Sequence, residues 1–146
     1  MKPHEFLEVA DEWVAGIREA EWRSAVSRAY YAAFHVARDL LQKCGFMVPQ
    51  GEQAHAYLWL RLSNSIHPDV KLACGDLNYP RSMRNRADYD LDQPFPHTVA
   101  VGQVQAAEDI IKLFDAIPAT PTVQAQITTA IKDYEQKVLG QNTWQP

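Results

Sequence analysis

The stretch WRSAVSRAYYAAFHVARDLL at residues 22–41 decides the fold class. Its apolar side chains recur every three or four positions, which is the spacing of one face of an α-helix. No other segment carries so long an apolar stripe, so we expect this helix at the centre of the core, with Gly45 ending it. The apolar positions are Trp22, Ala25, Val26, Ala29, Tyr30, Ala33, Phe34, Ala37, Leu40 and Leu41.

Helical spacing also dominates the neighbouring sequence. Apolar residues predict a first helix over about 6–17 and a third over about 52–65, with Arg61 on the same side as Tyr57 and Leu62. Residues 69–89 predict a fourth helix that is bent or split near Tyr79-Pro80, because proline breaks a helix interior but suits a first turn.

Two more helices follow a proline-containing loop. Thr98 is the expected N-cap of the fifth helix. Thr120 and Pro121 are expected to open the sixth helix, which carries Val138 on its apolar stripe and ends at Gly140. No segment alternates like a strand over a convincing length. The chain is therefore predicted to be all-α, a mostly antiparallel bundle of five to six helices.

Length and composition limit the function classes. The 146 residues predict a single domain over 1–140, with a frayed tail at 141–146. The net charge of −4 argues against a protein that coats nucleic acid by bulk charge. Within residues 22–90, nine Lys and Arg outnumber six Asp and Glu. This excess predicts an anion-binding surface in the middle of the chain, or else chance scatter over a solvated surface.

Several kinds of chemistry lack their sequence signals. Cys44 and Cys74 are too few for a disulfide framework, and no Cys or His spacing indicates a metal site, so no metal is expected. No phosphate-binding glycine loop is present, and no cofactor is expected. The sequence shows neither a signal peptide nor a membrane-spanning stretch, so a cytoplasmic protein without membrane contact is expected.

The densest basic cluster consists of Arg81, Arg84 and Arg86. Arginine suits phosphate because its planar fork donates two parallel hydrogen bonds. Arg84 and Arg86 can instead pair with Asp88 and Asp90, four residues further along a helix. The cluster therefore predicts either an anion site or local ion pairs on a solvated face.

A second polar group lies on the central helix, opposite its apolar stripe. Two arginines, a tyrosine and a histidine in one line can hold a phosphate and move a proton. A solvated face or a subunit contact is the alternative. His55 on the third helix is either a satisfied buried histidine or a partner of the arginine cluster. The polar stripe consists of Ser24, Arg28, Tyr31, His35 and Arg38.

Two of these segments resemble a known family. Residues 22–37 are similar to the signature helix of HEPN-domain proteins, and Arg84-Asn85-Arg86-Ala87-Asp88-Tyr89 is similar to their later R-x-x-A-D-Y signature. His55 lies where many members have a histidine between the two motifs. The resemblance covers about residues 5–117 and implies a HEPN-like helical bundle. The helix over about 120–139 is an addition to it.

The resemblance implies a homodimer and a place among toxin–antitoxin, defence or RNA-processing systems, often beside a minimal nucleotidyltransferase that acts as antitoxin. Many HEPN proteins are metal-independent ribonucleases with an Arg, a polar residue and, a few residues later, a His. Arg84 and Asn85 match the start of that motif, whereas Tyr89 stands in place of the histidine. Tyrosine titrates near ~10 and histidine near ~6.5, so Tyr89 is a weak general base at neutral pH.

Two hypotheses follow from the resemblance. The first is a module that binds RNA, a nucleotide or a partner nucleotidyltransferase without efficient catalysis. The second is an active ribonuclease with Arg84, Asn85 and Tyr89 in a composite dimer site, where His35 or His97 is an alternative proton-transfer group. Tyr89 is also an expected modification site, because some family toxins are silenced by adenylylation of a motif tyrosine. The expected binding residues are Arg28, Tyr31, His35, Arg81, Arg86 and Asp88.

Overall fold

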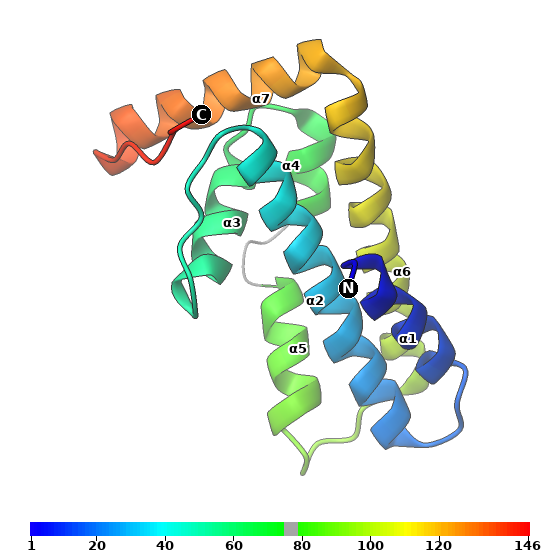
Figure 1. Cartoon of the computed structure of the whole chain (residues 1–146). Coiled ribbons are helices and arrows are strands. Elements are labelled where there is room, and N and C mark those ends of the chain that lie inside the picture. Colours follow the sequence, from blue (N-terminus) through cyan, green and yellow to red (C-terminus); the bar gives the residue numbers. More distant parts are fainter. Residues whose placement is uncertain (75–78) are drawn as a thin grey trace.

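The computed structural model describes residues 1–74 and 79–146, and the predicted all-α class is confirmed for that part of the chain (Figure 1). Pro80 lies in the first turn of α5, where its missing N–H costs no hydrogen bond. Gly75, which the sequence analysis includes in the fourth segment, lies outside the described residues. In the described ranges, no helix has the length and apolar character needed to cross a bilayer. The helices are α1 (His4–Val14), α2 (Glu19–Lys43), α3 (Gln53–Ser63), α4 (Pro68–Cys74), α5 (Tyr79–Tyr89), α6 (His97–Ala116) and α7 (Pro121–Tyr134), with a 3-10 turn at Ile117–Ala119 and a π-helical turn at Glu135–Leu139.

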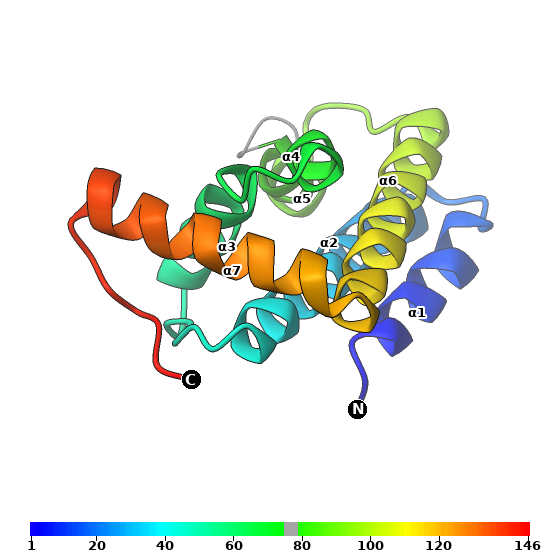
Figure 2. The same ribbon diagram turned by 90° about the horizontal axis from the view of Figure 1, so that it is seen from above.

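α2 is the central helix, as its apolar stripe predicts. α1 and α6 pack on one side of it, and α3 and α5 pack on the other (Figures 1 and 2). Every predicted stripe position is buried except Trp22, which is half-buried. Because neighbours cover most of α2, its polar side chains must share narrow spaces with α1, α3 and α5.

A capping carboxylate and a glycine set the ends of α2. Glu21 in the first turn accepts the backbone N–H groups of Ile17 and Arg18 at 3.1 and 2.9 Å. Gly45 follows the helix at φ +97°, a left-handed conformation that favours glycine, so the predicted stop is confirmed. A Cβ at Gly45 would also lie 2.9 Å from the indole nitrogen of Trp144.

The limits of the last helix are also as predicted. Thr120 is the N-cap residue of α7, and Pro121 is its first residue. After the π-helical turn, Gly140 adopts the left-handed conformation at φ +62°. The helix start at Pro121 uses a residue whose fixed φ suits a first turn.

Two other predicted helix limits are wrong. α1 ends at Val14, so Ile17 lies in the following loop and is 89% exposed. α6 begins at His97 rather than after Thr98, which places Thr98 inside the first turn. Apolar period alone does not define where a helix begins or ends.

The C-terminal residues are docked, so the prediction of a frayed tail at 141–146 is wrong. The backbone N–H of Gln145 donates to the carbonyl of Gly45 at 2.7 Å. The indole of Trp144 donates to the carbonyl of Cys44, 100 positions earlier in the sequence, at 3.0 Å. The ammonium of Lys132 lies 3.5 Å from the centre of the Trp144 ring, a cation–π contact. These contacts hold the tail against the end of α2.

A buried ion pair anchors the tail from inside. Glu135 in the π-helical turn is 1% exposed and accepts the Nε and one terminal N–H of Arg61 in α3 at 3.0 and 2.8 Å. The hydroxyl of Thr143 donates to the same carboxylate at 2.7 Å. Arg61 is only 3% exposed, whereas Val138, which is predicted on the apolar stripe, is 65% exposed. Glu135 continues the i, i+4 spacing of the buried Ile127 and Ile131, and the π-helical turn that begins there moves Val138 off the α-helical period.

Candidate functional site

Arg84 lies on the inner face of α5, against α2. Its side chain is 5% exposed, and the guanidinium carbon is 5.6 Å from the ring centre of Tyr30 and 5.5 Å from that of Tyr31. Met83 and Ala87 share this face and are buried with apolar residues of α2 and α6, which explains why α5 turns Arg84 inward. A cation within ~6 Å of an aromatic ring is attracted to its face, so the two tyrosines hold the charge.

Arg84 has unused hydrogen-bonding capacity. Its ion pair with Asp88 is long, at 3.8 Å between a terminal nitrogen and Oδ2, which exceeds hydrogen-bond distance. Its Nε is buried and has no hydrogen-bond partner within residues 1–74 and 79–146. The Asp88 carboxylate in turn accepts the Ser27 hydroxyl at 3.1 Å. A buried N–H of a charged group without a partner is costly, so this arrangement favours an additional anion.

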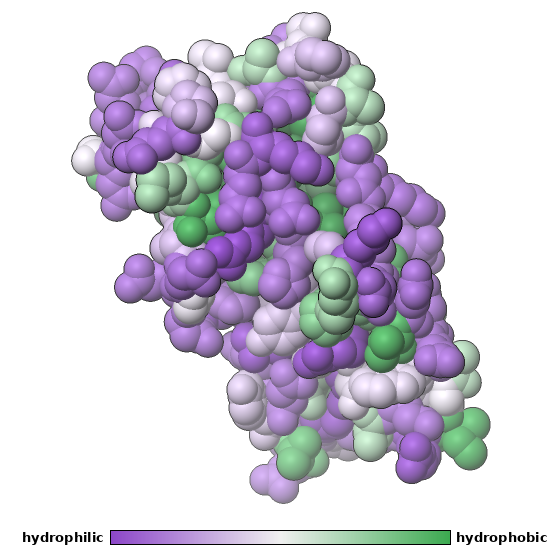
Figure 3. Space-filling view, in the orientation of Figure 1, coloured by the Kyte–Doolittle hydropathy of each residue, from purple (hydrophilic) through white to green (hydrophobic). Residues whose placement is uncertain are grey.

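Arg28, Tyr31 and His35 lie together on α2 and are half-buried. The guanidinium carbon of Arg28 is 5.2 Å from the ring centre of Phe6 in α1 and 5.4 Å from that of Tyr31. The His35 ring stacks on Phe6 with 5.8 Å between centres and 11° between planes. The face that carries α2 in the view of Figure 1 is largely hydrophilic (Figure 3). The Tyr31 ring lies beside the guanidinium groups of both Arg28 and Arg84, so it connects the polar stripe of α2 with Arg84.

His55 reaches the same tyrosines from α3. It is buried, and its Nδ1 lies 2.6 Å from the hydroxyl of Tyr30, while its ring centre is 5.7 Å from the Tyr30 ring. The indole N–H of Trp59, which can only donate, points to the same Tyr30 oxygen at 3.4 Å. With Trp59 donating to its oxygen, the Tyr30 hydroxyl has its own proton available for Nδ1, an arrangement in which neutral His55 carries its proton on Nε2.

Both His35 and His55 have a pKa below the ordinary value of histidine. Burial lowers the pKa of His35, and the positive charge of Arg38 lowers it further. Burial also lowers the pKa of His55, and the positive charge of Arg81 adds to that effect. A neutral imidazole can accept one proton and donate another, so these side chains suit proton transfer rather than charge pairing. We call Arg28, Tyr30, Tyr31, His35, His55 and Arg84 the Arg84 site.

The other predicted catalytic residues lie on the opposite face of α5. Asn85 and Tyr89 are exposed, the latter by 72%. With Arg81 and Arg86 they line an open depression of about 580 Å³. The structure therefore divides the motif, because Arg84 and Asp88 face α2 whereas Asn85 and Tyr89 face outward.

Arg81 and Arg86 each have one polar partner, although the buried Nε of Arg81, like that of Arg84, has no hydrogen-bond partner among the described residues. Arg81 forms an ion pair with Glu52 at 2.8 Å, and Glu52 is well exposed. Arg86 donates to the carbonyl of Pro94 at 3.3 Å and lies 5.6 Å from the ring centre of Phe95. Partly exposed pairs of this kind exchange readily with a ligand because they contribute little free energy.

Arg23 supports the site but was not among the predicted residues. It comes from α2, is 7% exposed, and donates to the carbonyls of Arg86, Ala87 and Asp90 at 3.1, 3.0 and 3.1 Å, and also to that of Gln93. These carbonyls belong to the last turn of α5 and the loop after it, so Arg23 caps α5 in the place of a local residue. No local pattern in the sequence marks this role, because the carbonyls that Arg23 caps lie 63 to 70 positions away.

The remaining candidate histidine is used elsewhere. His97 lies 2.7 Å from the carbonyl of Val14 through Nε2, and its ring packs on Trp22 with 4.9 Å between centres. It is thus a contact between α6 and α1 rather than part of the Arg84 site. Among the described residues, no group of three or more His, Cys, Asp and Glu side chains is placed to hold a metal ion.

Comparison of the chain with protein-family models, with curated proteins and with solved structures finds no match. The geometry around Arg84 and the motifs of the sequence are therefore the basis on which a function is proposed.

Proposed function

We propose that this chain is a HEPN-like module that binds a phosphate group of RNA or of a nucleotide at Arg84, as part of a toxin–antitoxin or defence system. The observation that carries the proposal is the incomplete pairing of Arg84. Its Nε lacks a partner among the described residues, and its carboxylate neighbour Asp88 stands at 3.8 Å. A phosphate oxygen is the ligand chemistry that matches a guanidinium with free donors.

Aromatic neighbours give the site a means of holding more than the phosphate. Tyr31 and His35 are half-buried and lie beside Arg28, so a base can stack there while the arginines hold the backbone. Binding of this kind weakens as salt rises, because each phosphate contact releases counterions.

Binding of 5′-labelled single-stranded RNA, measured by fluorescence anisotropy, tests this proposal. Arg84→Met keeps an apolar stem of similar length, and we expect it to lower RNA affinity by about 10-fold or more, from the loss of charged hydrogen bonds. Lys112→Met is the matched control, because it removes one positive charge from an exposed ion pair on α6. Equal loss in both variants, with helicity retained, would reduce the effect to bulk charge and contradict the proposal.

A second candidate function is metal-independent RNA cleavage. The observation that favours it is that His35 and His55 both flank Phe34, at 5.1 and 4.5 Å between ring centres. A neutral imidazole at one position can take the proton of a ribose 2′-hydroxyl, and the leaving 5′-oxygen would receive its proton from the other imidazole in its protonated form. Tyr89, exposed on the other face of α5, would enter such a site from a second copy in a homodimer.

Incubation of labelled total RNA with the protein in EDTA separates the two functions. The ribonuclease predicts 2′,3′-cyclic phosphate ends with the wild type and none with Arg84→Met. The binding module predicts intact RNA with both proteins and weaker RNA binding by the variant. Light scattering of the same samples tests whether the protein is a homodimer. A partner nucleotidyltransferase is tested by comparing adenylylation of the wild type, which carries Tyr89, with that of Tyr89→Phe.

A further inference from the structure

Arg28 and Arg38 extend the positive charge of the Arg84 site along the polar stripe of α2. Both side chains are half-buried, so a ligand can reach them from solvent. Neither guanidinium forms an ion pair or a side-chain hydrogen bond within residues 1–74 and 79–146. An arginine without a carboxylate partner can bind a phosphate without first losing an existing contact.

The two arginines lie at either end of the stripe, with Tyr31 and His35 between them. The residues recur three and four positions apart, which places them on one side of the helix. A rise of ~1.5 Å per residue separates Arg28 from Arg38 by ~15 Å along the helix axis. Arg84 joins from α5 at Tyr31, whose ring centre lies 5.5 Å from its guanidinium carbon. Three arginines therefore follow the same side of α2.

Aromatic rings lie between these arginines. Phe6 of α1, Tyr31 and His35 are all half-buried. The centres of the Tyr31 and His35 rings are 6.5 Å apart, and Phe6 stacks on the other neighbour of this pair, His35, at 5.8 Å. Arginines that follow a nucleic-acid backbone, together with aromatic rings on which bases stack, are typical of surfaces that bind single strands.

The acidic residues of α1 do not cancel this charge. Burial raises the pKa of Asp11, and the nearby carboxylate of Glu108 on α6 raises it further. Asp11 therefore faces α6, whereas Phe6, on another side of α1, contacts the polar stripe. Asp39 and Asp88 lie near the stripe, but neither comes within hydrogen-bond distance of its arginines or of Arg84 in the described ranges.

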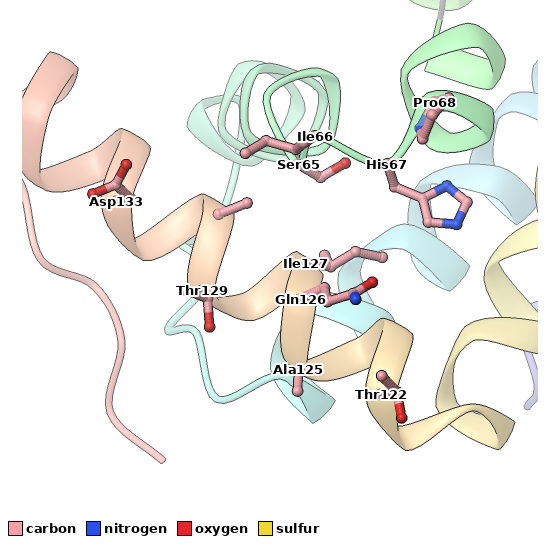
Figure 4. A pocket seen from close by; sticks show the side chains of 11 residues that line it. Ser65, Ile66, His67, Pro68, Thr122, Ala125, Gln126, Ile127, Thr129 and Asp133 are labelled. Atoms are coloured by element: carbon pink, nitrogen blue, oxygen red, sulfur yellow. The ribbon is translucent and has the colours of Figure 1, made fainter.

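Two hollows elsewhere on the molecule lack this combination. The hollow between the α3–α4 junction and α7 has no Lys or Arg among its described lining residues, so it offers no cation to a phosphate (Figure 4). The depression on the outer face of α5 carries Arg81 and Arg86, but each already has a polar partner. Of these three surfaces, the polar stripe is the one that combines unpaired arginines with several aromatic rings.

We propose that the ligand of the polar stripe is a single strand of RNA several nucleotides long, rather than a free nucleotide, and that Arg38 binds one of its phosphates. This inference rests on the proposed function, because it extends the phosphate site at Arg84 toward both ends of the stripe. Phosphates of a stacked strand follow one another about every 3.4 Å, so ~15 Å of α2 corresponds to about four of them. Arg28, Arg84 and Arg38 each bind a different phosphate, and the bases stack on the rings between them.

Competition by unlabelled uridylates against a 5′-labelled RNA strand, followed by fluorescence anisotropy, tests the length of the ligand. We expect UMP to compete about 100-fold less well than a strand of four uridylates, because UMP reaches only one of the three arginines. Strands longer than about four nucleotides should gain little further affinity, because they extend past the ends of the stripe.

Arg38→Met tests the end of the stripe. It should lower the affinity of the four-nucleotide strand about 5-fold and leave that of UMP unchanged. The slope of log affinity against log salt concentration should become shallower by ~0.7, the change expected for one lost phosphate contact with a single strand. Lys112→Met is the matched control, since it removes one positive charge from α6, and its slope should equal that of the wild type. Should Arg38→Met fail to fold, Arg28→Met repeats the test at the other end.

Arg84→Met separates this inference from the proposed function. It should weaken the binding of UMP and of the strand alike, because both use the phosphate position at Arg84. Equal competition by UMP and the four-nucleotide strand, or equal salt slopes for Arg38→Met and Lys112→Met, would overturn the strand proposal and leave phosphate binding at Arg84 in place. Unchanged affinity of both ligands in Arg84→Met would instead overturn the proposed function and this inference with it.

Discussion

Arg61 and Arg84 are both buried arginines, and the structure holds them in opposite ways. Arg61 donates to Glu135 at 3.0 and 2.8 Å and to Gln141 at 2.9 Å, and it lies over the Tyr57 ring at 3.6 Å. Arg84 has one long ion pair at 3.8 Å and an Nε without a partner in the described part of the chain.

This difference indicates that Arg61 and Arg84 have different roles. Every guanidinium nitrogen of Arg61 already donates within the protein, so Arg61 ties α3 to the C-terminal tail. A guanidinium that is buried but incompletely paired leaves the fold with an uncompensated cost. Binding of an anion at Arg84 would remove that cost.

The largest expected effect concerns the buried ion pair between Arg61 and Glu135. Glu135→Ala leaves Arg61 buried without its carboxylate, and we expect it to lower the free energy of unfolding by ~3–5 kcal/mol. Urea denaturation followed by circular dichroism measures the change. The double variant Arg61→Met with Glu135→Met, which removes both charges, should recover most of the lost stability. A loss below ~1 kcal/mol in Glu135→Ala would contradict the distinction between the two arginines.

The second largest expected effect concerns Arg84. Arg84→Met should change the free energy of unfolding by no more than ~1 kcal/mol, because the ion pair that it breaks is long and Asp88 is partly solvated. The same variant should lose RNA affinity by about 10-fold or more. Large destabilisation without loss of binding would make Arg84 a structural residue like Arg61.

A third prediction uses pH, since the buried histidines lie beside Arg84 and not beside Arg61. Burial holds the pKa of His55 below its ordinary value near ~6.5, so the unfolded chain takes up protons first as the pH falls. The free energy of unfolding should therefore decrease from about pH 6.5 down through the lower pKa of folded His55, and this contribution should then level off.

His55→Gln isolates that contribution, because glutamine keeps an acceptor for the Tyr30 hydroxyl and does not titrate. Urea denaturation at several pH values should show a shallower loss of stability on the acid side of pH ~6.5 for the variant than for the wild type. Parallel profiles for the two proteins would show that His55 is not held neutral by the fold.

Sequence patterns predicted the elements better than the contacts between them. The apolar period of residues 22–41 placed α2 at the centre, and Gly45 and Gly140 marked real helix ends. The sequence places Arg61 on the same helix side as Tyr57 and Leu62, but its partner Glu135 lies 74 positions away, where α7 passes into a π-helical turn. No local pattern identifies such a pair.

In the candidate site, too, the sequence predicted the residues better than the contacts between them. The motif around Arg84 was visible in the sequence, yet the inward direction of Arg84 and the outward direction of Tyr89 depend on how α5 packs against α2. Arg23 reaches carbonyls 63 to 70 positions away, so its capping role depends on the same packing. The docking of Trp144 against Cys44 is likewise a long-range contact, and the polar sequence of the tail does not predict it.

The smallest expected effect separates the two arginines most directly. Asp88→Asn removes the one carboxylate that competes with a phosphate for Arg84, while its side-chain oxygen can still accept the Ser27 hydroxyl. Because a partly exposed pair contributes ~0.2–1 kcal/mol, RNA affinity should rise by about 2- to 5-fold and stability should change little. Glu135→Gln, the matched change at Arg61, should instead lower stability without changing RNA affinity. Anisotropy titrations and urea curves on both variants measure these outcomes, and weaker RNA binding by Asp88→Asn would show that Asp88 orients Arg84 rather than competing for it.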